Sequence, residues 1–152
     1  MKKVDILVIS LTPPLQIGLY HDRELIKVLK SEDKTSEALP LIFDKILKKY
    51  TINALYFAKG PGSFMAIKVT YIFLRTLSIT KNLPLFATEG FTFNDNNPIK
   101  ATGALYFMKK DGKILTEKIS TPQTRQDFTL PTTLEQTHFS NDVEPLYVLP
   151  AV

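Results

Sequence analysis

The sequence predicts an α/β fold in which a mixed five-stranded sheet with helices is followed by a small β-rich part. Three apolar runs separated by turn residues lie within residues 4–29 and predict an antiparallel meander. Between residues 36 and 87, helical and strand patterns alternate with short joints. That alternation is typical of βαβ units, so it adds two further strands to the sheet.

The meander begins with Val4 to Ser10, which is apolar at both alternating sets of positions. This pattern indicates a central strand covered on both faces. Thr12-Pro13-Pro14 ends the run, and an extended pattern resumes from Gln16 to Tyr20, which predicts a hairpin-like return. Glu24 to Leu29 is expected to form the third strand.

An amphipathic helix is predicted next, because apolar residues recur every three or four positions. Ser36 or Thr35 is expected to cap its start. Pro40 fits if it lies in the first turn or kinks the helix, and Leu41 points to the otherwise polar back. The apolar stripe consists of Leu39, Ile42, Phe43, Ile46, Leu47 and Tyr50.

A second strand that is apolar on both faces is predicted from Asn53 to Ala58. The run Lys59-Gly60-Pro61-Gly62-Ser63 then turns the chain into a long helix, from Ser63 to Lys81. Leu83 to Ala87 is predicted as the strand that completes the sheet.

Two lobes are predicted, residues 1–92 and a reduced lobe over residues 99–152. Lys109-Lys110-Asp111-Gly112 between two apolar segments indicates a β-hairpin in the second lobe. Thr121 to Asn141 is rich in Thr and Gln, so irregular structure is expected there. Leu146 to Leu149 is predicted to return as a terminal strand.

The composition excludes several kinds of site. With no cysteine in 152 residues, disulfides, thiolate metal sites and a cysteine nucleophile are ruled out. His21 and His138 lie far apart and match no metal motif, and no spacing brings two carboxylates together. Ser10 and Ser63 have no base identifiable in the sequence. The N-terminus carries no signal-peptide cleavage pattern, so we expect a cytoplasmic protein.

The charge is mildly basic, with 19 Lys and Arg against 15 Asp and Glu and a formal net charge of +4. Such an excess permits weak attraction to nucleic acid or acidic partners, but it also serves solubility alone. No arginine-rich run supports the first interpretation.

The glycine-rich turn has two interpretations. Gly60, Gly62 and Ser63 at a helix start could cradle an anion through backbone N–H groups. The turn lacks both the P-loop ending and the dinucleotide fingerprint. The alternative is a tight turn that needs a positive φ, followed by Ser63 as N-cap.

The helix after this turn is apolar around most of its circumference, interrupted by the charges of Lys68 and Arg75. Two cations in so short a segment argue against a membrane span. Either the helix is enclosed within its own domain, or part of it is a surface for a partner.

Gly60-Pro61-Gly62-Ser63-Phe64, placed after an apolar strand and opening a helix, resembles the TsaB (YeaZ) family. Ile6 to Ile9, Ser36 to Leu47, Leu83-Pro84-Leu85 and Pro145 to Val148 resemble that family too. The resemblance is good over residues 4–88. It implies an actin/hexokinase/sugar-kinase-like (ribonuclease H-like) lobe.

The resemblance further implies a non-catalytic scaffold in tRNA N6-threonylcarbamoyladenosine synthesis. Its partners would be a TsaD-like catalytic subunit and a TsaE-like ATPase, with a homodimer as the alternative assembly. Contact with tRNA would be indirect, no membrane would be involved, and the chain would hold no cofactor, with ATP bound only weakly or through partner subunits. The interface expected on the two helices consists of Phe43, Ile46, Phe64, Ile67, Lys68, Tyr71, Leu74 and Arg75.

The sequence departs from the family at Ile9-Ser10-Leu11, where Ile-Asp-Thr is usual, and at Met65-Ala66 and Lys68 after the turn. A competing hypothesis is a vestigial nucleotide-binding or nucleotide-hydrolysing enzyme, or a peptidase-like one, that uses the Lys59–Ser63 turn and Lys68. A third is direct tRNA contact, through Lys45, Lys48 and Lys49 or through Lys109, Lys110 and Lys113.

Overall fold

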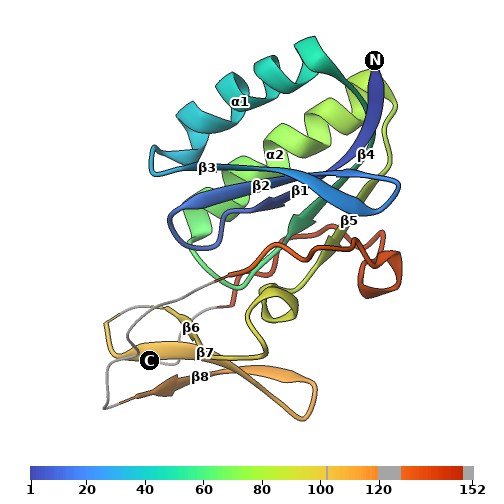
Figure 1. Cartoon of the computed structure of the whole chain (residues 1–152). Coiled ribbons are helices and arrows are strands. Elements are labelled where there is room, and N and C mark those ends of the chain that lie inside the picture. The colour runs from blue at the N-terminus through green and yellow to red at the C-terminus, as the bar shows by residue number, and fades with distance from the viewer. Residues whose placement is uncertain (102, 120–127, 149–152) are drawn as a thin grey trace.

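The computed structural model describes residues 1–101, 103–119 and 128–148. Its main body is a five-stranded sheet in the order β3-β2-β1-β4-β5, with two helices on one face (Figure 1). The strands are β1 (Lys2–Ile9), β2 (Leu15–His21), β3 (Glu24–Ser31), β4 (Tyr50–Ala58) and β5 (Leu85–Thr88). The predicted meander and the two added strands are confirmed.

The strand β1 lies at the centre of the sheet, as its two apolar faces predict. It pairs antiparallel with β2, where Ile6 faces Leu19, and parallel with β4, where Ile6 faces Leu55. β4 in turn pairs parallel with β5. The carboxyl ends of β1, β4 and β5 therefore meet at one edge of the sheet, beside the glycine-rich turn.

The helices α1 (Thr35–Lys49) and α2 (Phe64–Lys81) cover the same face of the sheet. Ser63 caps α2 as predicted, since its Oγ accepts a hydrogen bond from the Ala66 N–H. The predicted cap of α1 is wrong: Lys34 occupies that position, and no side chain bonds to the helix start. Pro40 lies in the second turn of α1 rather than the first.

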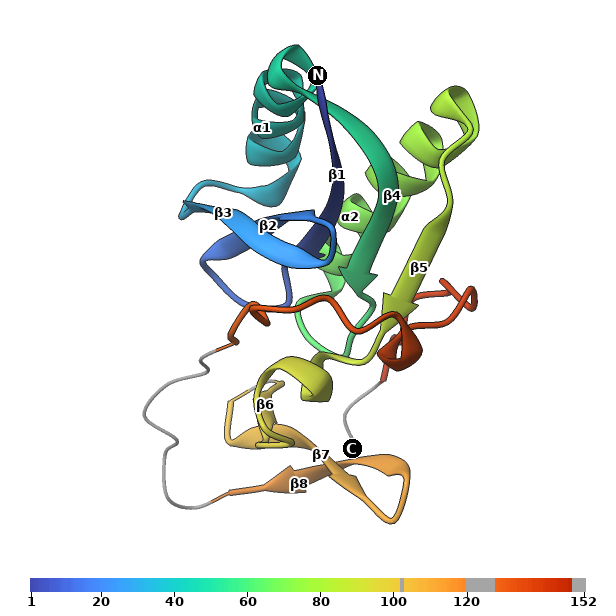
Figure 2. The ribbon, with the colours of Figure 1, turned by 45° about the vertical axis from the view of Figure 1, so that its right-hand side comes forward.

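The opposite face of the sheet is covered by the end of the chain. Residues 128–148 run between the main sheet and a second, smaller one (Figure 2). Side chains of β2 hold this segment: the Gln16 amide donates to the Phe128 carbonyl at 2.8 Å, and the Tyr20 hydroxyl donates to the Pro131 carbonyl at 2.7 Å. Phe128 and Leu130 join the apolar core on this face.

This placement corrects the expected division of the chain. Residues 128–148 pack on the first lobe, whereas the prediction assigned all of residues 99–152 to the second. The predicted terminal strand is also wrong over Leu146–Val148, which form no strand; position 149 lies outside the described residues. Irregular structure is found over residues 128–141, as expected, with one short 3-10 turn, Gln136–His138, and two isolated bridges; residues 121–127 lie outside the described part.

The smaller sheet has the order β6-β7-β8 and consists of β6 (Ile99–Lys100), β7 (Leu105–Lys110) and β8 (Lys113–Lys118). The predicted hairpin is confirmed, with Asp111 and Gly112 both at positive φ in its turn. A 3-10 turn at Gly90–Phe93 connects β5 to this sheet.

Candidate functional site

The glycines of the turn at the start of α2 are required by close packing of the chain on itself. Gly60 has φ +127°, and a Cβ there would lie 2.6 Å from the carbonyl oxygen of Leu146. A Cβ on Gly62 would lie 2.8 Å from the carbonyl oxygen of Leu11. Neither position tolerates a side chain, so the glycine requirement has an explanation that needs no ligand.

Backbone hydrogen bonds fix this turn from several sides. The Ser63 N–H donates to the Leu11 carbonyl at 2.9 Å, so this group of the predicted anion cradle is already used. Gly60 accepts from the Gly90 N–H at 2.9 Å. The Lys59 carbonyl accepts from the Leu146 N–H at 2.8 Å. The geometry favours the tight-turn interpretation of Gly60, Gly62 and Ser63.

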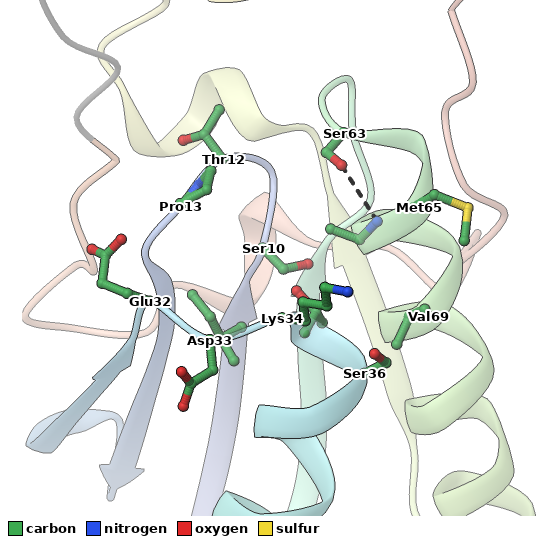
Figure 3. A pocket seen from close by; sticks show the side chains of 13 residues that line it. Ser10, Thr12, Pro13, Glu32, Asp33, Lys34, Ser36, Ser63, Met65 and Val69 are labelled. Atoms are coloured by element: carbon green, nitrogen blue, oxygen red, sulfur yellow. Dashed lines mark hydrogen bonds between the residues drawn. The ribbon is translucent and has the colours of Figure 1, made fainter.

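A pocket of about 560 Å³ lies beside this turn, between the start of α2 and the loop that leads into α1 (Figure 3). Ser63, Met65 and Val69 form one wall. The opposite wall is formed by Glu32, Asp33 and Lys34; the Lys34 ammonium points toward α2, whereas the carboxylates of Glu32 and Asp33 point away from it (Figure 3). The three side chains together carry a net charge of about −1, which does not favour a phosphate, so the pocket adds no support to a nucleotide site.

Ser10, which lines the floor of this pocket, is not placed as a nucleophile. Its Oγ lies 2.7 Å from Oγ1 of Thr70, and both side chains are buried. A serine nucleophile needs a hydrogen-bonded base, and Ser10 is instead paired with another hydroxyl. Across residues 1–101, 103–119 and 128–148, no cluster of three His, Cys, Asp or Glu side chains could hold a metal ion.

The structure corrects half of the interface predicted from the resemblance. Phe43, Ile46, Ile67 and Leu74 are at most 2% exposed. They form part of the molecule's own core because they face the sheet, so they offer no surface to a partner.

The other four predicted residues reach the surface to different degrees. Lys68 and Arg75 are exposed, and Tyr71 is half-buried. Phe64 is 38% exposed and packs edge-on against Tyr147, with ring centroids 5.6 Å apart.

Three apolar residues of α2 that the prediction did not select form its exposed stripe. Met65, Ile72 and Ile79 are 70%, 53% and 69% exposed. Their spacing of seven residues places them along one side of the helix, and we call them the α2 stripe. That spacing is visible in the sequence and could have separated them from the buried side.

A shallow apolar groove of about 390 Å³ lies next to this stripe, between α1 and α2. Ile72 belongs to both the groove and the stripe. Leu41, which the sequence placed on the back of α1, is 66% exposed. The groove is lined by Ser36, Leu39, Pro40, Val69, Ile72, Phe73, Thr76, Leu77 and Thr80.

In the part of the chain that the structure describes, neither α1 nor α2 has the length and hydropathy needed to cross a bilayer.

Comparison with known proteins shows the fold. No family model matches the sequence, and no curated protein matches it. The structure is similar to that of YeaZ from Pseudomonas aeruginosa, with a TM-score of 0.59 and 13% identity over 78% of this chain and 66% of that one. It is also similar to an uncharacterized protein described as similar to peptidase YEAZ from Pseudomonas aeruginosa, with a TM-score of 0.61 and 13% identity over 84% and 71% of the two chains.

These likenesses confirm the predicted fold class, an actin-like α/β lobe with a small β lobe. The chain spans slightly less than two thirds of the length of the first of these proteins.

Proposed function

We propose that this chain is a non-catalytic assembly subunit that docks a larger TsaD-like catalytic subunit through the exposed side of α2. The complex, completed by a TsaE-like ATPase, would make N6-threonylcarbamoyladenosine in tRNA, in the cytoplasm. The YeaZ-like fold supports the family context. The observation on which the docking depends is the α2 stripe beside the groove between α1 and α2.

The stripe has the properties of a docking surface. Full burial of a Met or Ile side chain contributes about 1.5–3 kcal/mol of free energy relative to exposure. The three residues of the stripe are more than half exposed, so their burial against a partner would stabilise the complex by several kcal/mol. The groove beside them would accept side chains from a partner helix. Lys68 and Arg75 are exposed on the same helix and favour a partner whose contact surface has an acidic rim.

The catalytic alternatives lack a comparable observation. A nucleotide-binding enzyme would need donors at the Lys59–Ser63 turn, but the Ser63 N–H is bonded within the chain. The Lys59 ammonium donates a hydrogen bond to the backbone carbonyl of Asp142 at 3.0 Å and lies 3.7 Å from the side-chain carboxylate of the same residue. We therefore propose that ATP reaches the complex through its partner subunits.

Co-purification with a TsaD-type subunit tests the docking. Ile72→Glu and Ile79→Glu place a charge on the stripe, where burial in an interface is costly. We expect both variants to lose the partner in size-exclusion chromatography while their circular dichroism stays that of the wild type. Leu115→Glu on β8 is the matched control, because Leu115 is 43% exposed but belongs to the small sheet.

Retention of the partner by both stripe variants would contradict the proposed surface. Equal loss with Leu115→Glu would also contradict it, because the effect would then not depend on α2. In the absence of the partner, we expect the stripe to pair with a second copy of this chain. Sedimentation equilibrium would then give a dimer for the wild type and a monomer for Ile72→Glu.

A further inference from the structure

The loop between β5 and β6 and the segment that covers the opposite face of the main sheet enclose another pocket. Its volume is about 530 Å³, and parts of residues 92–97 and 129–139 line it. A backbone hydrogen bond from the Thr129 N–H to the Phe93 carbonyl, at 2.8 Å, joins the two segments. We call this space the loop pocket. Its volume is within the range of small-molecule sites.

Asn94 lines the loop pocket and has a buried acceptor without a partner. The residue is 7% exposed, and its Nδ2 donates to the Asn97 carbonyl at 2.9 Å. Because a carbonyl only accepts, this bond fixes the orientation of the side-chain amide. Its Oδ1 has no hydrogen-bond partner among the residues that the structure describes. Folded proteins pair nearly all such buried groups, so a donor from outside the chain is needed here.

The charge of the loop pocket indicates what kind of molecule supplies this donor. Asp95 and Glu135 both line it and are exposed, and its described lining contains no Lys or Arg. His138, which also lines it, is counted as neutral at pH 7. Within the described chain, neither carboxylate takes part in an ion pair. The two carboxylates therefore attract a cation into the pocket.

The charges next to the loop pocket do not cancel this attraction. Arg23 donates to the amide oxygen of Gln136 at 3.4 Å. The adjacent Glu24 accepts from the Thr133 hydroxyl at 3.3 Å, so the charges of Arg23 and Glu24 offset each other. The lysines on the far side of His138 are paired with carboxylates, Lys59 with Asp142 and Lys109 with Glu89.

An organic cation fits the loop pocket better than a metal ion does. In residues 1–101, 103–119 and 128–148, no three His, Asp or Glu side chains come close enough together to hold a metal. An ammonium group brings its own three N–H donors, which match an amide oxygen and carboxylates. Phe93 and Phe139, with ring centroids 6.1 Å apart, supply an apolar part of the lining. The faces of such rings attract cations.

We infer that the loop pocket binds a small organic molecule that carries an ammonium group. The ammonium donates to Oδ1 of Asn94 and is held by the charges of Asp95 and Glu135. Its carbon chain lies against the phenylalanine rings, where apolar surface is removed from water. This site goes beyond the proposed docking function and shares no residue with the α2 stripe.

Nuclear magnetic resonance of the isotope-labelled full chain, titrated with putrescine at low ionic strength, tests the inference. We expect the side-chain amide signals of Asn94 to shift as its Oδ1 gains a donor. The matched neutral probe is 1,4-butanediol, which has the same carbon chain with a hydroxyl in place of each ammonium. At the same concentrations it should leave these signals unchanged.

Asp95→Asn/Glu135→Gln removes the two charges and should weaken putrescine binding about tenfold. Asparagine adopts the positive φ of Asp95 as readily as aspartate does, so the loop is preserved. The matched control is Asp22→Asn/Glu144→Gln, which also removes an aspartate at positive φ and an exposed glutamate, but outside the loop pocket. It should bind putrescine like the wild type.

Equal weakening in the control would overturn the inference, since the net charge of the chain would then set the affinity. An equal response to 1,4-butanediol would overturn it as well, because the pocket would then take a neutral polyol. Unchanged Asn94 signals at saturating putrescine would leave a water as the partner of Oδ1 and contradict the site. Ile72→Glu should bind putrescine like the wild type, so failure of the docking proposal and failure of this one are distinguishable.

Discussion

The hydroxyl groups of Ser10 and Thr70 lie 2.7 Å apart and join the end of the central strand to the middle of α2. Both residues are buried, at 3% and 0% exposure. The pair fixes α2 against the sheet at the level of the glycine-rich turn. Ser10 stands where the TsaB family, which the sequence resembles, usually has an aspartate, and here the position has a structural role.

Removing one hydroxyl of this pair should destabilise the protein. Ser10→Ala leaves the buried Thr70 hydroxyl without its partner, so we expect the free energy of unfolding to fall by about 1–3 kcal/mol. Urea denaturation followed by circular dichroism measures the change.

The double variant Ser10→Ala/Thr70→Val provides the control. It removes both polar groups together, so its loss should be smaller than the sum of the two single losses. Strictly additive losses would show that the two hydroxyls do not stabilise each other.

Gly60→Ala should lower the free energy of unfolding more than Gly112→Ala does, although both glycines have a positive φ. A methyl group at Gly60 meets the Leu146 carbonyl at 2.6 Å, whereas Gly112 has φ +76° and open space around it. We expect Gly112→Ala to cost about 1–2 kcal/mol from backbone strain alone, and Gly60→Ala clearly more. Equal midpoints in thermal unfolding would mean that the contact with Leu146 is absent in solution.

Charged substitutions on α2 should have different effects on stability on its buried and exposed sides. Ile67→Glu places a carboxylate in the core at a position with 0% exposure, so we expect several kcal/mol of destabilisation and loss of the folded lobe. Ile79→Glu, on the exposed stripe, should change the unfolding midpoint little. Differential scanning calorimetry of the two variants checks the orientation of α2. A well-folded Ile67→Glu protein would contradict it.

Alkaline pH should weaken the fold through Tyr20. Burial raises the pKa of its phenol above the ordinary value, and the hydroxyl donates to the Pro131 carbonyl. Because the pKa is raised in the folded state, this stabilisation is complete below about pH 10 and is lost as the pH rises further. Burial raises the pKa of Tyr56 as well, so it contributes in the same direction.

Tyr20→Phe tests this assignment. The variant should be less stable at neutral pH by about 1 kcal/mol, because one hydrogen bond is lost. Its free energy of unfolding should then decline less steeply than that of the wild type above pH 10. Parallel declines for the two proteins would exclude Tyr20 as the titrating group.

The sequence was sufficient for the main sheet because the signals there are local. The two apolar faces of Val4 to Ser10 predicted the central strand, and the break at Pro13-Pro14 predicted the return of the meander. Ser63 as the cap of α2 followed from its place after the turn. In each case the residues that decide the structure are neighbours in the chain.

The contacts between distant segments were not predictable in the same way. The sequence showed that α2 is apolar around most of its circumference, but not that Ile67 faces the sheet while Ile72 faces outward. Only the tertiary contacts separate the two. The packing of residues 128–148 on the first lobe depends on partners in β2, such as Gln16 and Tyr20, more than 100 residues earlier. No local sequence pattern predicts a contact between segments so far apart in the chain.

That late segment affects how the protein acquires its structure. One face of the main sheet gains Phe128 and Leu130 only after the chain has been made as far as residue 130, about 100 residues after the strands of the meander that they cover. A nascent chain on the ribosome would thus display a half-covered sheet until residues 128–130 have emerged, and the packing of this face would have to wait for them. We expect newly made chains to depend on chaperones during this interval, and a chain interrupted before residue 128 to be degraded or to aggregate.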